Sequence, residues 1–233
     1  MASPSTSASP GIAERIAANL RSAIVRGRLR PGDPLPSERE LAERFDASRA
    51  SVREAVKRLE AWGLVTVRHG GATRVTDFLL SAGLDVLPHL VAPQGRPDPA
   101  ILADLHEVRG MILGWCAEQA AVRADPASVA RLDDLVVRMG AARSAAALQE
   151  LDYDFFQALV AITGNRVLGL FSNVLRDIYL GGRERFLPMY GPGVFDLAHH
   201  RDAVAAIRGR DPAAAGAAMR AHALSALRTL EAP

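Results

Sequence analysis

Residues 36–75 constrain the fold of this chain more than any other segment, because they encode two short capped helices followed by a tight hairpin. Ser37 precedes Glu40 by three residues, which is the spacing of a capping box at the start of a helix. Asp46 then interrupts the apolar period, and Ser48 is placed to cap a second helix. The sequence therefore predicts two helices separated by a short turn.

The second of these helices has an apolar side and a basic side. Its apolar residues recur at steps of three and four, as expected for a buried stripe: Val52, Ala55, Val56 and Leu59. Arg49, Ser51 and Arg53 stay outside that stripe, in the first turn and a half of the helix. A recognition helix uses this part of its surface to reach base edges in the major groove, so the pattern predicts a DNA-reading helix.

The hairpin that follows is also basic. Two alternating runs, 64–68 and 72–75, predict strands, and residues 69–71 predict the turn between them. The basic residues placed at its tip are Arg68, His69 and Arg74. A small α/β domain with ordinary charged faces is the alternative, but the agreement of three elements favours a winged helix-turn-helix that binds double-stranded DNA.

Three segments of this region resemble the DNA-binding domain of GntR-superfamily transcription regulators. They are residues 35–42, residues 48–55 and Arg68-His69-Gly70, and the resemblance covers about residues 11–77. It implies that the following residues approach DNA: Arg39, Ser48, Arg49, Ser51, Arg53, His69 and Gly70. A palindromic operator read by a homodimer is the expected partner.

Charge and hydropathy agree with a two-domain regulator. Residues 1–77 hold thirteen Lys and Arg against nine Asp and Glu, whereas the remainder holds fifteen against seventeen, so the basic excess lies with the DNA motif. No run of eighteen apolar residues occurs, which excludes a single apolar membrane-spanning helix. Residues 1–10 lack the charge and apolar run of a signal peptide, so we expect a disordered lead and a cytoplasmic protein.

The rest of the chain predicts helices. A Pro-rich connection with a short helix that docks against one domain is expected over 78–99, because several residues there are too apolar for a free linker: Leu79, Leu80, Leu84, Val86 and Leu87. Residues 100–233 have the punctuation of an all-α bundle, with helices expected at about 100–124, 126–142, 145–163, 166–187, 194–209 and 212–230. The fold class is therefore mainly α, with a small β-hairpin wing.

Enzyme chemistry is not indicated. The chain lacks a Gly-rich phosphate loop, a Gly-x-Ser-x-Gly elbow and a His-Glu-x-x-His helix. Its single cysteine, Cys116, excludes an intramolecular disulfide, and its apolar neighbours predict a packing role in the core. We therefore expect a binding protein that requires no cofactor.

Four potential ligands lie on three separate predicted helices of the bundle: Asp152 on one, His199 and His200 at the start of another, and His222 on the last. Their oxygen and nitrogen atoms are ones that a divalent metal accepts, and inward-facing ligands on different helices can build such a site. The alternative is that each side chain is solvated or locally bonded, which is the commoner case for isolated histidines. Spacing alone leaves both readings open.

This second half resembles the FCD effector domain of the FadR subfamily. The resemblance lies in residues 102–121, in residues 151–165, and in His200 and His222. Metal-binding members carry a histidine four residues after the position of Asp152, where this chain has Phe156. Phenylalanine cannot coordinate a metal, so the resemblance implies at most a weak site at Asp152, His200 and His222 and leans towards acyl-CoA-responsive members.

The resemblance implies a small-molecule effector, and we place its site at Arg109, Asp152, Phe156, His200 and His222. A fatty acyl-CoA that controls genes of fatty-acid metabolism is the first expectation. The alternative is a small carboxylate, with or without metal, that controls a repressor of a catabolic operon. In that case Arg109, His200 and His222 would line a small polar pocket. A DNA-binding architectural protein without an effector is the other class considered.

Overall fold

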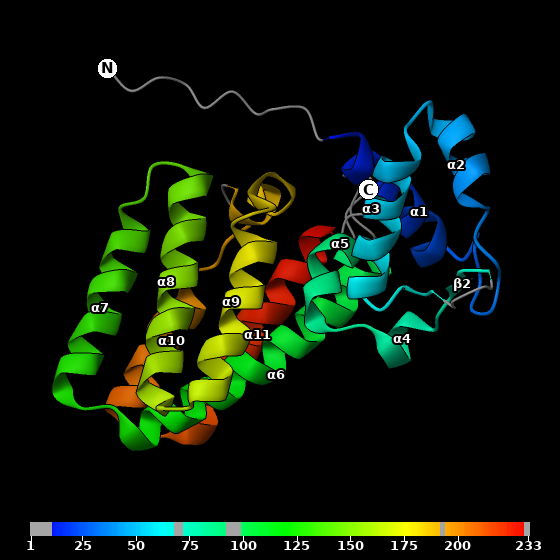
Figure 1. Cartoon of the computed structure of the whole chain (residues 1–233). Helices are drawn as coiled ribbons and strands as arrows, with labels where there is room; N and C mark the ends of the chain where they lie inside the picture. Colours follow the sequence, from blue (N-terminus) through cyan, green and yellow to red (C-terminus); the bar gives the residue numbers. More distant parts are fainter. Residues whose placement is uncertain (1–10, 68–71, 92–98, 192–193, 231–233) are drawn as a thin grey trace. The chain divides into compact units, whose positions relative to one another are not determined.

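A computed structural model gives the structure of residues 11–67, 72–91, 99–191 and 194–230, with backbone only for Asp85, Pro99 and residues 226–230. The chain divides into two compact units, residues 1–96 and 97–233, which are treated separately below (Figure 1). No helix in these described ranges is long and apolar enough to cross a bilayer. The fold class is mainly α with one small antiparallel sheet, as the sequence predicts.

The first unit is a three-helix core with a hairpin. Its larger elements are α1 (Ile12–Val25), α2 (Glu38–Phe45), α3 (Arg49–Ala61), β1 (Val65–Thr66) and β2 (Arg74–Val75). The apolar stripe of α1 packs against α3 and is buried at Ile16, Leu20 and Ile24. On α3, Val52 and Leu59 have no exposed surface, and each fully buried aliphatic side chain of this kind contributes about 1.5–3 kcal/mol to stability.

The helix starts follow the capping residues read from the sequence. The Ser37 hydroxyl accepts from the backbone N–H of Glu40, whose carboxylate in turn accepts from the N–H of Ser37 at 2.7 Å, so the capping box is complete. The Ser48 hydroxyl accepts from the N–H of Ser51 at 3.1 Å at the start of α3. Both predicted caps are thus confirmed.

The hairpin is shorter than predicted and gains a third segment. β1 and β2 are antiparallel, with Val65 opposite Val75. Residues 32–35 run along the other side of β2, where the N–H of Leu35 donates to the carbonyl of Thr73 at 2.8 Å. Gly32 and Pro34 obscure the strand pattern of that segment, so sequence alternation alone did not reveal it.

Gly63 joins α3 to the hairpin in a backbone conformation that favours glycine, with φ of 68°. A Cβ atom at this position would lie 2.5 Å from the backbone oxygen of Ser81, so the close approach also requires glycine. The Gly63 carbonyl accepts hydrogen bonds from the hydroxyls of Ser81, at 2.8 Å, and of Thr76. This turn is therefore tied to the segment that follows the hairpin.

The connection after the hairpin contains three short helical segments rather than the single predicted helix. They are α4 (Phe78–Ser81), η1 (Leu84–Val86) and α5 (Leu87–Val91). Leu79 and Leu80 are 79% and 86% exposed, so the expectation that they dock was wrong. Val86, Leu90 and Val91 are buried instead, because α4 has a single turn and its leucines point outward.

The second unit is a helical bundle. Its helices are α6 (Pro99–Arg123), α7 (Pro126–Gly140), α8 (Ala145–Thr163), α9 (Arg166–Tyr179), η3 (Arg183–Arg185), η4 (Leu187–Tyr190), α10 (Ala198–Arg208) and α11 (Pro212–Leu230). α6 and α11 lie side by side, α8 packs against α6, α7 and α9, and α10 packs against α6, α7 and α11 (Figure 1). Cys116 is fully buried in α6, and burial raises the pKa of its thiol to about 12, which confirms the predicted core role.

Two helix bounds in this unit differ from those predicted. α9 ends at Tyr179 and not near residue 187, because Gly181 and Gly182 follow and favour a break. α10 begins at Ala198 and not at 194, and the Asp196 carboxylate accepts from the N–H of Ala198 at 2.8 Å. The freed segment between the two helices forms η3 and η4.

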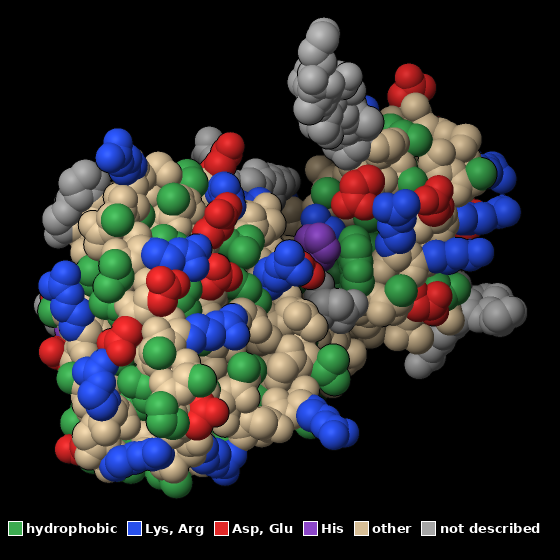
Figure 2. All heavy atoms as spheres, turned by 90° about the vertical axis from the view of Figure 1, so that its left-hand side faces the viewer, with side chains coloured by type: hydrophobic (Ala, Val, Ile, Leu, Met, Phe, Trp, Pro, Cys, Tyr) green, Lys and Arg blue, Asp and Glu red, His purple; other side chains and the backbone are tan. Residues whose placement is uncertain are grey.

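On the face of this unit that Figure 2 shows, positive and negative side chains are mixed, and neither sign forms a separate patch. Lys and Arg side chains alternate there with Asp and Glu, and apolar side chains are scattered between them. This mixture agrees with the small net negative charge of the second half of the sequence.

Candidate functional sites

The first candidate site is the exposed start of α3. Arg49, Ala50 and Arg53 are exposed there, and Ser51 is half-buried with its hydroxyl 3.0 Å from that of Ser48. The stripe on the opposite side of the helix is buried in the core, which fixes the direction in which the arginines project. The geometry suits insertion of this helix end into a groove.

Three of the four described basic residues predicted to contact DNA already have partners within the chain. Arg53 forms an ion pair with Glu38 at 2.8 Å, Arg39 pairs with Glu43 at 3.2 Å, and Arg74 donates to the carbonyl of Gly32 at 2.7 Å. Exposed pairs of this kind contribute at most about 1 kcal/mol, so a phosphate or a guanine can replace the carboxylates.

Arg49 has no partner among the residues that the structure describes. Its guanidinium is therefore the most available for a base or a phosphate. The predicted contacts at Arg68, His69 and Gly70 lie outside the described residues.

The second candidate site is a polar cluster inside the bundle, centred on Asp152. Asp152 lies on the buried face of α8, together with Gln149 one turn earlier and Phe156 one turn later. Ser144 caps the start of this helix, and Gly164 ends it with φ of 65°. Both ends of the helix are therefore fixed by local sequence.

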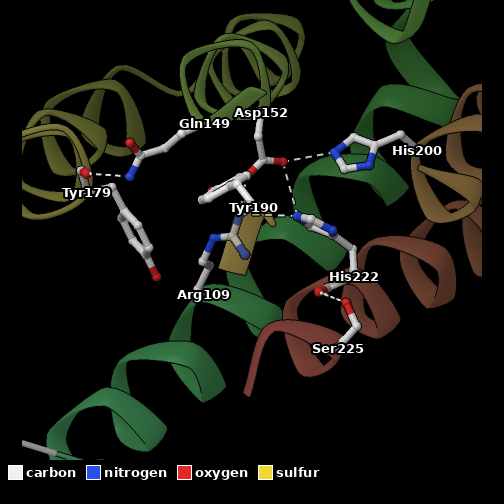
Figure 3. A network of polar contacts seen from close by, with 8 residues as sticks. All are labelled: Arg109, Gln149, Asp152, Tyr179, Tyr190, His200, His222 and Ser225. Atoms are coloured by element: carbon white, nitrogen blue, oxygen red, sulfur yellow. Dashed lines mark hydrogen bonds and ion pairs between the residues drawn. The ribbon is translucent and has the colours of Figure 1, made fainter. Parts of the chain in front are cut away.

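Four side chains from four other elements converge on the Asp152 carboxylate. Oδ1 lies 2.9 Å from His200 Nε2 and 3.1 Å from His222 Nε2, on α10 and α11 (Figure 3). Oδ2 accepts from Arg109 Nη2 on α6 and from the Tyr190 hydroxyl on η4, both at 2.8 Å. Asp152, His200 and His222 are each at most 3% exposed, and Arg109 is 8% exposed.

Burial and charge set the protonation states of this cluster. Burial alone raises the pKa of the Asp152 carboxyl, but His222 and Arg109 outweigh it and hold that pKa well below its usual range. Burial lowers the pKa of His222 to about 4, although Asp152 opposes the shift. Burial and the neighbouring Asp152 raise the pKa of Tyr190 well above its usual range. At neutral pH the carboxylate is thus ionised beside a neutral phenol.

Two recesses meet at this cluster. The inner recess has about 370 Å³ of space between atoms and is lined by Arg109, Ile112, Gln149, Asp152, Tyr153, Phe156, Leu175, Tyr179 and Tyr190. The outer recess is smaller, about 240 Å³, and is lined by Arg109, Met189, Tyr190, Val194, Phe195, His222 and Ser225. Arg109 and Tyr190 belong to both, so a ligand in either recess meets the cluster.

The structure brings the five predicted effector residues together. Arg109, His200 and His222 contact Asp152, and Phe156 lines the inner recess beside them. What they bind remains a prediction.

Sequence reasoning missed four polar residues around the cluster: Tyr190, Tyr179, Gln149 and His106. The amide of Gln149 donates to the backbone carbonyl of Tyr179 at 2.9 Å (Figure 3). His106 is fully buried on α6. Gln149 had a detectable signal, since it precedes Asp152 by three and Phe156 by seven residues and so shares their helix face. Tyr190 had none, because it lies in a Pro- and Gly-rich segment with no helical period.

A divalent metal fits this cluster poorly. The ligand atoms of Asp152, His200 and His222 lie within 4.8 Å of one another, as a metal requires. A metal-bound imidazole, however, normally donates its second ring N–H to an acceptor. Nδ1 of His200 and Nδ1 of His222 are buried and have no partner among the described residues. Phe156, one turn after Asp152 on the same helix face, offers no ligand atom, so these residues fit weak binding only.

Comparisons with known proteins agree on a family. The family described as "Bacterial regulatory proteins, gntR family" matches residues 12–75, and the FCD domain matches residues 104–225. The HTH-type transcriptional regulator Mce2R of Mycobacterium tuberculosis is 36% identical over 72% of this chain and 70% of its own length. The fatty acid metabolism regulator protein of Escherichia coli is 33% identical over 70% of this chain and 67% of its own length.

A solved structure adds a likeness of fold alone. It is that of Lar, which controls the expression of the Listeria monocytogenes agr system. It covers 95% of this chain and 97% of its own, with a TM-score of 0.55 and 13% sequence identity.

Proposed function

Since this chain belongs to the GntR family of bacterial regulatory proteins and carries an FCD domain, we propose that a fatty acyl-CoA controls its binding to DNA. The chain is a DNA-binding transcription regulator and not an enzyme.

DNA reading is assigned to a homodimer on a palindromic operator. Each first unit would place the start of α3 in the major groove of one half-site, with Arg49, Ser51 and Arg53 facing the bases. The exposure of Arg49 and Arg53, opposite the buried Val52, Ala55 and Leu59, supports this orientation. Arg39, Ser48 and Arg74 would contact the backbone of the same half-site.

Alanine at Arg49 or Arg53 should weaken operator binding by about 1–3 kcal/mol and relax discrimination at one base pair, because a bidentate contact with guanine is lost. Arg74→Ala should weaken all sequences alike, because it removes a phosphate contact. Fluorescence anisotropy on a set of single-base operator variants measures both effects. Arg138→Ala, an exposed arginine of α7 in the second unit, is the matched control.

Glu38→Gln adds a test of the ion pair with Arg53. The variant frees the Arg53 guanidinium, so it should bind the operator at least as tightly as the wild type. Unchanged affinity and unchanged base preference for both Arg49→Ala and Arg53→Ala would contradict the assignment of α3 as the recognition helix.

The observation that carries the acyl-CoA proposal is the two-sided lining of the inner recess. Ile112, Phe156 and Leu175 provide an apolar wall, and the guanidinium of Arg109 provides hydrogen-bond donors at the same recess. An acyl chain against the wall would place its thioester carbonyl within reach of the donors. The name of the Escherichia coli relative, a fatty acid metabolism regulator protein, supports the same class of ligand.

The size of the inner recess suggests how binding is transmitted. Its enclosed volume is only about 20 Å³, so a long acyl chain must separate the helices α8 and α9, which contribute Phe156 and Leu175 to its lining. Movement of these helices would change the separation of the recognition helices in the dimer. A coupling free energy of about 1–3 kcal/mol is enough to alter operator affinity several-fold to a hundredfold.

Long-chain acyl-CoA should release the chain from its operator, and release should strengthen with chain length until the recess is filled. Each buried methylene contributes about 0.8 kcal/mol. The free fatty acid should act less well, because it lacks the phosphates that exposed arginines would attract, and this difference should shrink in high salt. Titration of a fluorescent operator complex with acyl-CoAs of increasing length gives the measurement.

A matched pair of variants on α9 locates the effect. Leu175→Phe narrows the inner recess and should shorten the optimal chain, whereas Leu170→Phe lies at an exposed position and should leave it unchanged. A response that is flat across chain lengths would contradict the acyl-CoA proposal.

A small carboxylate is the second candidate, and the buried polar cluster favours it. Arg109, His222 and Tyr190 meet at one point, as expected for recognition of a compact acid. Release of the operator by a short dicarboxylate or a sugar acid, but not by acyl-CoA, would select this candidate.

A further inference from the structure

The buried cluster around Asp152 contains its own permanent cation. Arg109 Nη2 lies 2.8 Å from Asp152 Oδ2 and 3.2 Å from His222 Nε2. A guanidinium cannot lose its proton in a protein, and the proximity of Asp152 keeps the pKa of Arg109 raised despite its burial. Arg109 therefore supplies a fixed positive charge in direct contact with the Asp152 carboxylate.

This guanidinium lies where it opposes a metal ion. A divalent ion bound to Asp152, His200 and His222 would share two of its three ligand residues with Arg109. The two cations would repel each other within a buried site, where charges are poorly screened. Phe156 offers no ligand atom, which by itself makes metal coordination weak. The positive charge of Arg109 is a second, separate obstacle to a metal ion.

The rest of the guanidinium is available to a ligand. Nη1 and Nε of Arg109 have no hydrogen-bond partner among the residues that the structure describes, and Arg109 lines both recesses. The face of the Tyr179 ring lies 5.3 Å from the guanidinium carbon and helps to fix its plane. The cation is thus anchored through one nitrogen and open at the others.

We propose that Arg109 replaces the metal ion as the fixed positive charge of this effector site. It neutralises Asp152 permanently, excludes divalent metals, and offers its free N–H groups to an anionic or carbonyl oxygen of the effector. Only this last role rests on the proposed function. The exclusion of metal follows from the position of Arg109 and can be tested without DNA or effector.

Four proteins separate the role of Arg109 from that of Phe156: the wild type, Phe156→His, Arg109→Met and the double variant. Phe156→His supplies a third imidazole, and so a fourth potential ligand, one turn from Asp152. Arg109→Met removes the cation while keeping an unbranched apolar side chain. Calorimetric titration of the full-length chain with Ni²⁺ or Zn²⁺, and elemental analysis after dialysis, measure metal binding. We expect the double variant to bind at least tenfold more tightly than Phe156→His, which should remain weak like the wild type.

Arg109→Lys combined with Phe156→His is the matched control. It keeps a positive charge at the site, so its metal affinity should resemble that of Phe156→His alone. Circular dichroism and thermal melts establish that each variant is folded. If the Arg109→Met proteins do not fold, the comparison of Phe156→His with the wild type still decides: weak binding supports the proposal and tight binding contradicts it.

Two further results would overturn the proposal. One is a stoichiometric metal in the dialysed wild type that is lost on His200→Ala or His222→Ala. The other is equal affinity of Phe156→His and the double variant, which would show that Arg109 does not exclude the ion. Failure of acyl-CoA to release the operator would leave the metal results unaffected, so the two proposals fail separately.

Discussion

Replacing Arg109 by alanine should lower the free energy of unfolding of the second unit by about 3–5 kcal/mol. The substitution leaves the Asp152 carboxylate 3% exposed and without its permanent counter-charge. Tyr190 still donates a hydrogen bond to it, but a hydrogen bond from a neutral phenol does not balance a buried charge. Urea denaturation followed by Trp115 fluorescence, in a Trp62→Phe background, reports on this unit.

An exposed ion pair of the same unit is the control. Arg208 donates to Asp133 at 2.7 Å, and both side chains are about half exposed. Arg208→Ala should therefore cost less than about 1 kcal/mol. A similar cost for both variants would mean that burial of the Arg109–Asp152 pair has no special consequence.

A double-mutant cycle sharpens this prediction. Asp152→Asn alone leaves Arg109 as an unpaired buried cation, and Arg109→Met alone leaves the carboxylate unpaired. The protein with both substitutions lacks both charges, so its loss should be smaller than the sum of the single losses by more than about 1 kcal/mol. Additive losses would contradict direct coupling between the two side chains.

Acid should destabilise the second unit well above the pH at which ordinary carboxylates titrate. Burial lowers the pKa of His222 to about 4 and, with the help of Arg109, lowers that of His106 to about 3, both from 6.5. As pH falls from about 6.5 towards 4, the unfolded chain takes up protons at these histidines and the folded chain does not. The free energy of unfolding should therefore decrease by on the order of 1 kcal/mol per pH unit for each histidine.

His106→Leu tests the larger of these two contributions. His106 is fully buried, and neither ring nitrogen has a partner among the described residues. An apolar side chain of similar size avoids this cost, so the variant should exceed the wild type in stability at pH 5 and should show a shallower pH dependence. Equilibrium denaturation between pH 8 and pH 4.5 gives the slopes.

His199→Gln provides the comparison for that series. His199 lies next to His200 on α10 but retains a quarter of its side-chain exposure, so its replacement should leave the slope unchanged. A slope that is the same in the wild type and in His106→Leu would show that His106 does not resist protonation in the folded chain.

Local rules predicted the first unit well. Ser37 and Ser48 satisfy specific backbone N–H groups, so the starts of α2 and α3 follow from residue type and spacing. The end of α9 was harder, because Leu180 continues the apolar period and only Gly181 and Gly182 oppose it. The exposure of Leu79 and Leu80 was not predictable from hydropathy, since it depends on the single turn of α4.

In the candidate effector site too, some residues could be predicted from the sequence and others could not. Resemblance to a family pointed to Asp152, His200 and His222, and the structure brings these three together. Tyr190 donates to the same carboxylate from a segment without a periodic pattern, so only the path of the chain reveals it. The pairing of Arg109 with Asp152 joins residues 43 positions apart, and no local pattern specifies such a contact.

The Gly63 turn also has a mechanical meaning. Its carbonyl is bonded to Thr76 at the end of the hairpin and to Ser81 at the end of α4, so three parts of the first unit share a single oxygen atom. A force that pulls on the chain after Ser81 would act on the C-terminal end of α3 through these hydrogen bonds, and not through the hydrophobic core. A bulkier residue at this point would collide with the backbone of Ser81 and break these hydrogen bonds, so glycine here connects the segments as well as turning the chain.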